Sequence, residues 1–463
     1  MLYRLMRWVA TIALRWFYRD VEVDCAERIP RSGPMLLVVN HPNALVDVLA
    51  VATAIPRRIT FTGKAVLFDN PFLRVFLPLM GFVPLRRAKD EATKKPDGKA
   101  DASRNADAFR AILDALERGG AVLVFPEGIS HNDPSLAPLK TGAARMALQA
   151  RDERGIHGLT ILPVGLTFEE KWQPRTRIFV HVGEPLALDD WTPLPTDSVT
   201  NSAEQLTKEI DARIRAITLN FPSADDAERV LGIARLLAGV FDEPRPLGSP
   251  DPPLGDQMRI VRRLESVRAA LPPAAEGNVR RFLEQVEQLR VTLARRAIVP
   301  NEVSLSPALH HGAWFAVREG AIITLLGPIA IWGRINHWVP LELALWLARR
   351  RSKSPEDPAM NTLVIGLAFV LVAYAAQTTL VWHFAGARWA IAYLLSLPIS
   401  ATWDLRFRDR MRRARQRMHT YFRFRRDPPL RTRLQQEIQQ VRAEALALEQ
   451  MALGEQRGVR RKA

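Results

Sequence analysis

The sequence contains almost no cysteine: Cys25 is the only one among 463 residues. An internal disulfide therefore cannot form, and nothing in the composition indicates an oxidising compartment. We expect a reduced location that faces the cytoplasm.

Recognisable cofactor motifs are absent as well. The chain has no P-loop and no glycine-rich dinucleotide fingerprint. Its 9 histidines and 1 cysteine show no ligand spacing such as H-E-x-x-H or C-x-x-C. We therefore predict no cofactor and no metal site.

Acidic side chains are outnumbered, with 49 Asp and Glu against 65 Lys and Arg, so the net charge is +16. Such an excess indicates a polyanionic partner, either nucleic acid or an anionic membrane surface. The segment from Arg406 to Arg433 holds 12 arginines and 2 aspartates, directly after the most apolar part of the chain. Arginines beside apolar segments favour lipid headgroups, so we expect membrane lipids and no nucleic acid as partners. The alternative is a buried helical core with a solvated basic face.

Long apolar runs are confined to the C-terminal half, at Gly320 to Gly333, Met360 to Phe384 and Trp389 to Trp403. The second run is long enough to cross a bilayer, whereas the other two are short for a span and suit the arms of a hairpin or a re-entrant segment.

The loop "RRRSKSPEDP" between the first two runs carries four basic residues, which favours a cytoplasmic position. We predict two membrane hairpins that begin and end in the cytoplasm. The first is Gly320 to Ala348, bent near Arg334 to Pro340, and the second is Met360 to Trp403, bent near Gly386.

The N-terminal segment has an apolar stripe at helical spacing, formed by Leu2, Leu5, Val9, Ile12 and Trp16. Arginines lie on the opposite side, so we predict an amphipathic helix at the membrane interface. A removable signal peptide is the alternative, but an arginine interrupts its apolar centre and no small-residue cleavage site follows.

Residues 30 to 190 alternate β-rich runs with helical stretches. The β-rich runs are "PMLLVVN", "RRITFTG", "GFVPLRR", "AVLVFPEG", "LTILPVGLTF" and "TRIFVHVG". The helical stretches include Asp101 to Glu117 and Leu136 to Asp152. This alternation predicts an α/β fold, a sheet covered by helices.

We divide the chain into five segments. They are an interfacial helix (1–20), an α/β domain (21–220), a helical insert or linker (221–305), membrane hairpins (306–404) and a basic, helical tail (405–463). The insert shows helical periodicity with a proline-rich break, and the tail includes a probable helix at Leu434 to Gln450.

The stretch "LLVVNHPNALVD" ends an apolar strand in His41 and places Asp47 a few residues further on. Active sites of α/β sheets are built where strands end. Pro42 suits the first turn of a helix, so we expect Asp47 about one and a half turns into it, able to reach back to the imidazole. A carboxylate on one ring nitrogen leaves the other free to accept a proton, which is a general-base arrangement. The alternative is a capping histidine with an incidental acid.

Three further segments decide between these readings: "GFVPLRR" ending at Arg87, "VFPEGISH" from Val124 to His131, and "ILPVGLTF" from Ile161 to Phe168. With the histidine segment, and in this order, they resemble the four motifs of the phospholipid/glycerol acyltransferase superfamily. The resemblance covers roughly residues 20 to 190. It implies an enzyme that moves an acyl group from a thioester, acyl-CoA or acyl-carrier protein, to a glycerol hydroxyl.

The resemblance also implies site residues. His41 is the expected base and Asp47 its support, while Arg87, Glu127 and Gly128 are associated with binding of the acceptor and its phosphate. The further substrate-binding candidates are Lys64, Arg86, Ser130, His131 and Lys140; for His131 we favour a structural role over proton transfer. Backbone N–H groups near Gly128 are candidate donors to the oxyanion.

Two departures from the common family pattern indicate a subgroup. Five residues separate His41 from Asp47 where four are usual, and Ser130 and His131 replace the usual Arg-Ser. Both variants resemble the fungal glycerol-3-phosphate/dihydroxyacetone-phosphate acyltransferases, which implies acylation of glycerol 3-phosphate or dihydroxyacetone phosphate in glycerophospholipid synthesis. The alternatives are acylation of 1-acyl-glycerol 3-phosphate or another lysophospholipid, an inactive scaffold, and a nucleic-acid binder. The extra residue turns Asp47 by about 100° around a helix, so the helix start must differ to absorb it.

Overall fold

The computed structural model describes residues 2–64, 74, 77–78, 81–85, 103–194, 199–238, 246–247, 252–351 and 357–462. The chain divides into two compact units. One comprises Met1–Pro222 with Ala344–Leu367, and the other comprises Ser223–Leu343 with Ala368–Ala463. The predicted division into five segments stays a prediction.

The first unit is built on one sheet. Among the described residues its strands are Asp20–Asp24 (β1), Met35–Val39 (β2), Ile59–Lys64 (β3), Phe82–Leu85 (β4), Ala121–Val124 (β5), Thr160–Phe168 (β6), Arg177–Val182 (β7) and Leu186–Ala187 (β8). Their order is β1-β7-β6-β2-β5-β3-β4, and β8 also pairs with β6. The strands from β6 to β4 run parallel, whereas β7 is antiparallel to β6. The predicted α/β fold is therefore confirmed.

Strand β2 lies at the centre of the sheet, between β5 and β6. All five of its side chains are buried, because parallel strands are covered on both faces. Met35, Leu37 and Val39 belong to one apolar cluster, and Leu36 and Val38 belong to the other. The strand therefore presents its carboxyl end, where His41 follows, from a rigid position.

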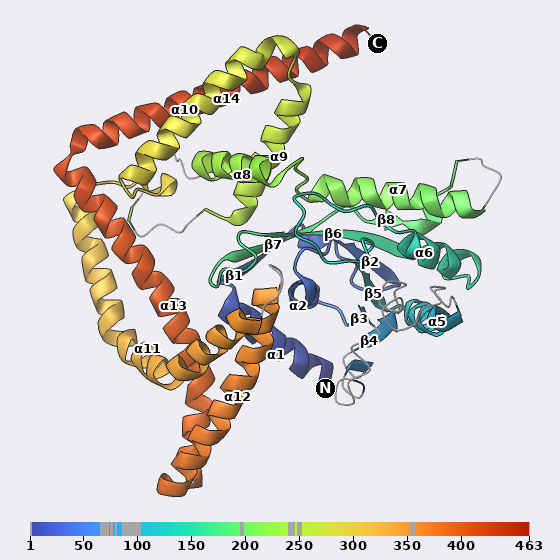
Figure 1. Cartoon of the computed structure of the whole chain (residues 1–463), viewed down its shortest axis with the longest axis horizontal. Coiled ribbons are helices and arrows are strands. Elements are labelled where there is room, and N and C mark those ends of the chain that lie inside the picture. The colour runs from blue at the N-terminus through green and yellow to red at the C-terminus, as the bar shows by residue number, and fades with distance from the viewer. Residues whose placement is uncertain are drawn as a thin grey trace. The chain divides into compact units, whose positions relative to one another are not determined.

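Helices cover both faces. They are Leu2–Phe17 (α1), Ala44–Ala54 (α2), Ser103–Glu117 (α5), Gly142–Asp152 (α6) and Val199–Ile217 (α7). The first two contribute side chains to one apolar cluster, and α5, α6 and α7 contribute to the other. In Figure 1, α7 runs along one face of the sheet while α1 and α2 lie on the other. Short 3₁₀ helices occur at Ala26–Arg28, Leu188–Asp190, Pro273–Ala275 and Pro300–Glu302.

The six predicted strands are all present, but β1 and β8 were not expected. The predicted helix from Leu136 was too long, since α6 begins at Gly142. The reason is local: the backbone N–H of Leu136 donates to Asn220 Oδ1 and that of Ala137 donates to Glu127 Oε2. These residues form a loop that is held by side chains.

Helix α1 has the predicted extent, but its buried face is not the predicted stripe. Leu14 and Phe17 pack into the core, whereas Leu5 and Trp8 are 54% and 59% exposed. Of the predicted stripe, Leu5 is exposed, whereas Val9, Ile12 and Trp16 are partly buried. Its expected place at a membrane interface stays a prediction.

The rest of the described chain is helical, as expected for residues 221 to 300. The helices are Ala224–Ala238 (α8), Leu254–Ala270 (α9), Glu276–Arg295 (α10), Leu309–Arg351 (α11), Asp357–Ala385 (α12), Ala387–Arg426 (α13) and Pro428–Lys462 (α14). The predicted helix at Leu434 to Gln450 is the middle of α14.

The first predicted hairpin does not consist of two helices joined by a turn, because α11 continues through Pro328 and Pro340 as one curved helix (Figure 1). Proline has no N–H to donate to the carbonyl four residues earlier. For Pro340 that carbonyl belongs to Asn336, and the Nε2 of Gln377 on α12 donates to it instead, at 3.0 Å. A neighbouring helix therefore supplies the missing donor, so the helix continues through Pro340 although it curves along its length in Figure 1.

The second predicted bend is confirmed. Gly386, with φ of +84°, separates α12 from α13, and α13 then continues past Trp403 into the basic segment. In the part of the chain that the structure describes, two helical segments are long and apolar enough to cross a membrane, Leu309–Ala348 and Thr362–Ala385. The first of them contains the run from Gly320 that we expected to be too short.

Gly333→Ala should destabilise the second unit, because the new Cβ would lie 2.2 Å from the Ser400 carbonyl oxygen on α13. Overpacking of this kind costs about 1–3 kcal/mol. The matched control is Gly320→Ala on the same helix, where no atom lies within 4 Å; it should be neutral or stabilising by up to about 1 kcal/mol. Thermal unfolding of the full chain in detergent measures both. Equal midpoints for the two variants would contradict the close α11–α13 contact.

Candidate active site

His41 follows β2 directly, but the helix behind it starts later than predicted. Helix α2 begins at Ala44, so Pro42 lies outside it and Asp47 lies in its first turn. We had expected Pro42 in the first turn and Asp47 further along. At the start of this helix Ala44 adopts a left-handed conformation, with φ of +46°.

With α2 starting at Ala44, the two predicted residues lie together. His41 Nδ1 lies 2.9 Å from Asp47 Oδ2, and the same oxygen accepts the Asn43 backbone N–H at 2.6 Å. Asp47 is fully buried and His41 is 8% exposed. Burial raises the pKa of the Asp47 carboxyl, and its hydrogen bonds to His41 and Asn43 act in the opposite direction. The carboxylate occupies Nδ1, so Nε2 is the ring nitrogen left to face a substrate.

Neighbouring side chains fix the imidazole and its loop. Phe125 stacks on His41 with ring centroids 3.8 Å apart and planes 14° from parallel. Asn43 donates from Nδ2 to Tyr18 OH at 3.0 Å. Asn40 exchanges two hydrogen bonds with the backbone of Leu166 on β6. The imidazole and the residues on both sides of it in the chain are thereby held in place.

These supporting residues were missed in the sequence. Asn43 stands inside "HPN" and Phe125 precedes "PEG", so their positions within motifs were the available signal. Tyr18 lies far from any motif, and its contact with Asn43 follows only from the fold.

Glu127 lies inside the protein, since it is only 2% exposed. Its Oε1 accepts the His41 backbone N–H at 2.7 Å, and its Oε2 accepts the Ala137 N–H at 2.9 Å. The same Oε2 contacts His131 Nε2. The carboxylate therefore links the ends of β2 and β5 rather than opening toward a ligand.

Ser130 and His131 contact the same loop. Ser130 Oγ accepts the N–H of Ala44, the residue in the left-handed conformation, at 3.0 Å. The His131 backbone N–H donates to the His41 carbonyl at 3.3 Å, and its Nδ1 accepts the Asp133 N–H at 3.2 Å. Both ring nitrogens of His131 thus have partners, as expected for a structural role.

Gly128 and Lys140 lie side by side. Gly128 has φ of +73°, and a Cβ there would come within 2.8 Å of Lys140 Nζ. The glycine therefore leaves room for the lysine side chain. The N–H of Gly128 donates to the Phe125 carbonyl at 3.0 Å, so this group is not a free donor for an oxyanion.

For the remaining predicted residues, the structure describes no side-chain position. Arg86 and Arg87 lie outside the described residues. Lys64 ends β3, where it pairs with Leu85 of β4, but its side chain is outside the described part of the chain.

Comparison with known proteins bears on this geometry. Residues 20–167 match the family model "Acyltransferase", and they contain both members of the buried His41–Asp47 pair. The chain contains an acyltransferase-family domain. The resemblance seen in the motifs is therefore confirmed at the level of the family.

Several curated relatives carry the same kind of domain. The chain is 25% identical over 40% of its length to an uncharacterized acyltransferase of Schizosaccharomyces pombe, and it covers 39% of that protein. It is 32% identical over 28% of its length to glycerol-3-phosphate O-acyltransferase 2 of Saccharomyces cerevisiae, covering 18% of it. It is 24% identical over 36% of its length to the chloroplastic 1-acyl-sn-glycerol-3-phosphate acyltransferase LPAT1 of Arabidopsis thaliana, covering 40% of it. The chain thus covers less than half the length of each of these relatives.

Glu127→Gln should destabilise the acyltransferase domain, because an amide offers one acceptor oxygen where the carboxylate offers two. One of the donors that Glu127 now satisfies would then meet the amide NH₂, and a buried unsatisfied group costs about 1–3 kcal/mol. Thermal unfolding in detergent measures the change. Glu204→Gln, on the exposed side of α7, is the matched control and should have no effect. An unchanged midpoint for Glu127→Gln would show that the network does not stabilise the fold.

Proposed function

We propose that the protein is a membrane-bound O-acyltransferase that moves a fatty acyl group from an acyl thioester to glycerol 3-phosphate or dihydroxyacetone phosphate. The observation that carries the proposal is the buried His41–Asp47 pair, with 2.9 Å between Nδ1 and Oδ2, inside a domain of the acyltransferase family.

The chemistry follows from this pair. With its Nδ1–H donating to Asp47, the imidazole presents Nε2 as a proton acceptor. His41 takes the proton of the acceptor hydroxyl as its oxygen attacks the thioester carbonyl carbon. When the tetrahedral intermediate collapses, the C–S bond breaks, and the proton on His41 passes to the leaving thiolate. Asp47 stabilises the imidazolium between these two steps, and no protein side chain becomes acylated.

Phosphate binding is the second requirement, since the acceptor carries a doubly negative group. Arg87 is the proposed contact because its planar guanidinium matches two phosphate oxygens. Lys140 and Lys64 are further candidates, and Lys140 lies against Gly128 next to the catalytic loop. Glu127 and Ser130 act in this proposal as positioning residues, since their contacts are with the His41 loop.

A second candidate acceptor is 1-acyl-glycerol 3-phosphate. Both classes of acceptor occur among the names of the relatives. The combination of five residues between His41 and Asp47 with Ser130 and His131 supports the first acceptor, through its resemblance to the fungal enzymes.

The proposed location is a cytoplasmic membrane with the acyltransferase domain on the cytoplasmic side. Support comes from the two helical segments long enough to cross a membrane and from large exposed apolar side chains near the α12–α13 turn, of which Phe384 is 79% and Trp389 is 68% exposed. Sedimentation with membranes should therefore survive high salt, whereas release by salt would indicate attachment by the arginines alone.

His41→Ala should lower kcat by about two to four orders of magnitude, the usual contribution of a general base. Asp47→Asn should lower kcat less, because the imidazole remains but loses its orienting carboxylate. His157→Ala, at an exposed position, is the control and should retain full activity. The assay follows release of free thiol from acyl-CoA with glycerol 3-phosphate present. Retention of more than about a tenth of the activity by His41→Ala would remove it from the mechanism.

The acceptor proposal predicts a higher kcat/KM for glycerol 3-phosphate than for 1-acyl-glycerol 3-phosphate. Arg87→Ala should lower kcat/KM for glycerol 3-phosphate by about 10- to 150-fold, because a charge-assisted hydrogen bond contributes about 1.5–3 kcal/mol. The KM for the thioester should change little. Arg87→Lys should restore part of the loss, since an ammonium lacks the bidentate geometry. Faster acylation of 1-acyl-glycerol 3-phosphate would establish the second candidate instead.

A further inference from the structure

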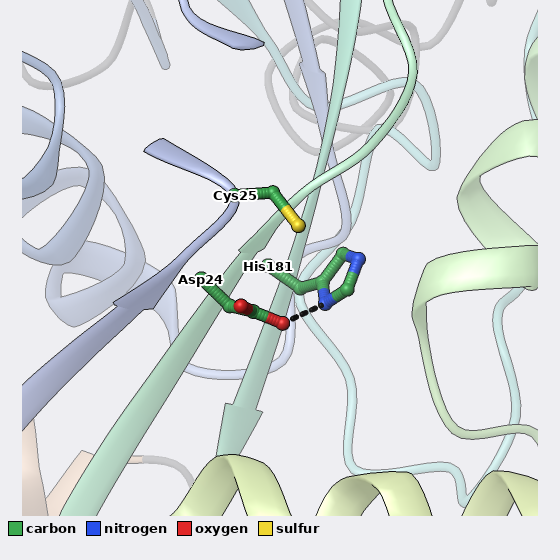
Figure 2. Close-up of side chains that lie close together, drawn as sticks. All are labelled: Asp24, Cys25 and His181. Atoms are coloured by element: carbon green, nitrogen blue, oxygen red, sulfur yellow. Dashed lines mark ion pairs between the residues drawn. The ribbon is translucent and has the colours of Figure 1, made fainter. Parts of the chain in front are cut away.

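Three side chains with different donor atoms converge where β1 ends. Asp24 is the last residue of β1, Cys25 follows it, and His181 belongs to β7. A carboxylate oxygen, the thiol sulfur and an imidazole nitrogen all lie within 4.8 Å of one another. Figure 2 shows the Cys25 sulfur and the Asp24 carboxylate on the same side of the strands as the His181 ring.

The backbone explains this convergence. Strands β1 and β7 are parallel, and Asp24 pairs directly with His181, so their side chains project from the same face of the sheet. A strand continued through Cys25 would direct its side chain to the other face. Cys25 instead has φ of +56°, a conformation that is uncommon for a residue other than glycine, and the alternation ends there. The thiol thereby joins the other two groups.

We propose that Asp24, Cys25 and His181 bind one Zn²⁺ ion. Zinc takes sulfur, nitrogen and carboxylate ligands together, in tetrahedral geometry. Bond lengths of about 2.0–2.3 Å in that geometry place ligand atoms about 3.4 Å apart. The contact between His181 Nδ1 and Asp24 Oδ2 is 3.1 Å, close to that value, and the remaining separations require side-chain movements of about 1 Å.

The charges also suit a divalent cation. A thiolate and a carboxylate supply two negative charges, and a neutral imidazole supplies the third ligand, so the bound site has no net charge. Binding replaces the thiol proton of Cys25, which passes to solvent. The fourth tetrahedral position is left for water.

The site is separate from the His41 loop. His181 lies on β7 and pairs with Gly165 of β6. Strand β7 is two positions from β2 in the sheet, which corresponds to about 10 Å at the usual strand spacing. Ile178, Val180 and Val182 of β7 belong to the same apolar cluster as Val39. Because successive side chains of a strand point to opposite faces, His181 faces the other side of the sheet. The ion would therefore tie β1 to β7 without entering the proposed acyl-transfer reaction.

The sole cysteine makes the test specific. Co²⁺ added to the full chain in detergent should give a sulfur-to-cobalt charge-transfer band, and only Cys25 supplies a sulfur of this kind. Zn²⁺ should abolish the band by competition at one ion per chain. Cys25→Ser should eliminate it. Asp24→Asn and His181→Gln should each weaken Zn²⁺ binding by more than about tenfold, since even an outer-shell partner contributes that much.

Two controls exclude weaker explanations. His157→Gln removes an exposed histidine elsewhere and should change nothing, and circular dichroism verifies that every variant is folded. Zn²⁺ should also slow alkylation of Cys25 by iodoacetamide in the wild type but not in His181→Gln. The absence of a cobalt band overturns the proposal. A band and an affinity that persist unchanged in both Asp24→Asn and His181→Gln also overturn it, because the thiol would then bind the metal alone.

Discussion

The hydrogen bond between His41 and Asp47 is the interaction on which the rest of the site depends. It joins the end of the central strand β2 to the first turn of α2, across a loop that contains one residue more than the common family spacing. The loop closes only because Ala44 turns into the left-handed region, which costs about 1–2 kcal/mol for a residue with a side chain. Its N–H then needs an acceptor, and Ser130 Oγ provides one. The two departures from the common motif are thus physically coupled.

The loop after β5 holds the His41 loop through three separate contacts. Glu127 accepts the His41 N–H, Ser130 accepts the Ala44 N–H, and the His131 N–H donates to the His41 carbonyl. Because β2 and β5 are adjacent parallel strands, their carboxyl ends lie side by side and the two loops meet. The motif that the family resemblance associates with substrate binding therefore also positions the loop of the proposed base.

The fold was predictable from the sequence because buried strands are local signals, whereas the His41–Asp47 pair was singled out by the four ordered motifs, since its spacing alone also allowed a capping histidine. The start of α2 was not predictable, since Pro42 suits a first turn and nothing local indicated that Ala44 would take a positive φ. The turn predicted near Pro340 is absent: the helix continues there, and Gln377 of another helix supplies the donor that proline removes. The grouping of Cys25 with His181 was equally hidden, because it depends on the pairing of β1 with β7 and not on any spacing along the chain.

The central claim is that His41 acts as a base, so that the acceptor hydroxyl attacks the thioester directly. A nucleophilic residue would instead carry the acyl group between the two half-reactions and give ping-pong kinetics. The most direct measurement has two parts. The full chain is mixed rapidly with acyl-CoA alone and the mass of the intact protein is determined. Initial velocities are then measured while the concentrations of both substrates are varied. The account predicts no acylated protein and intersecting initial-velocity lines. The account would be contradicted by an acyl adduct of the protein that forms without acceptor and disappears when glycerol 3-phosphate is added, together with parallel initial-velocity lines.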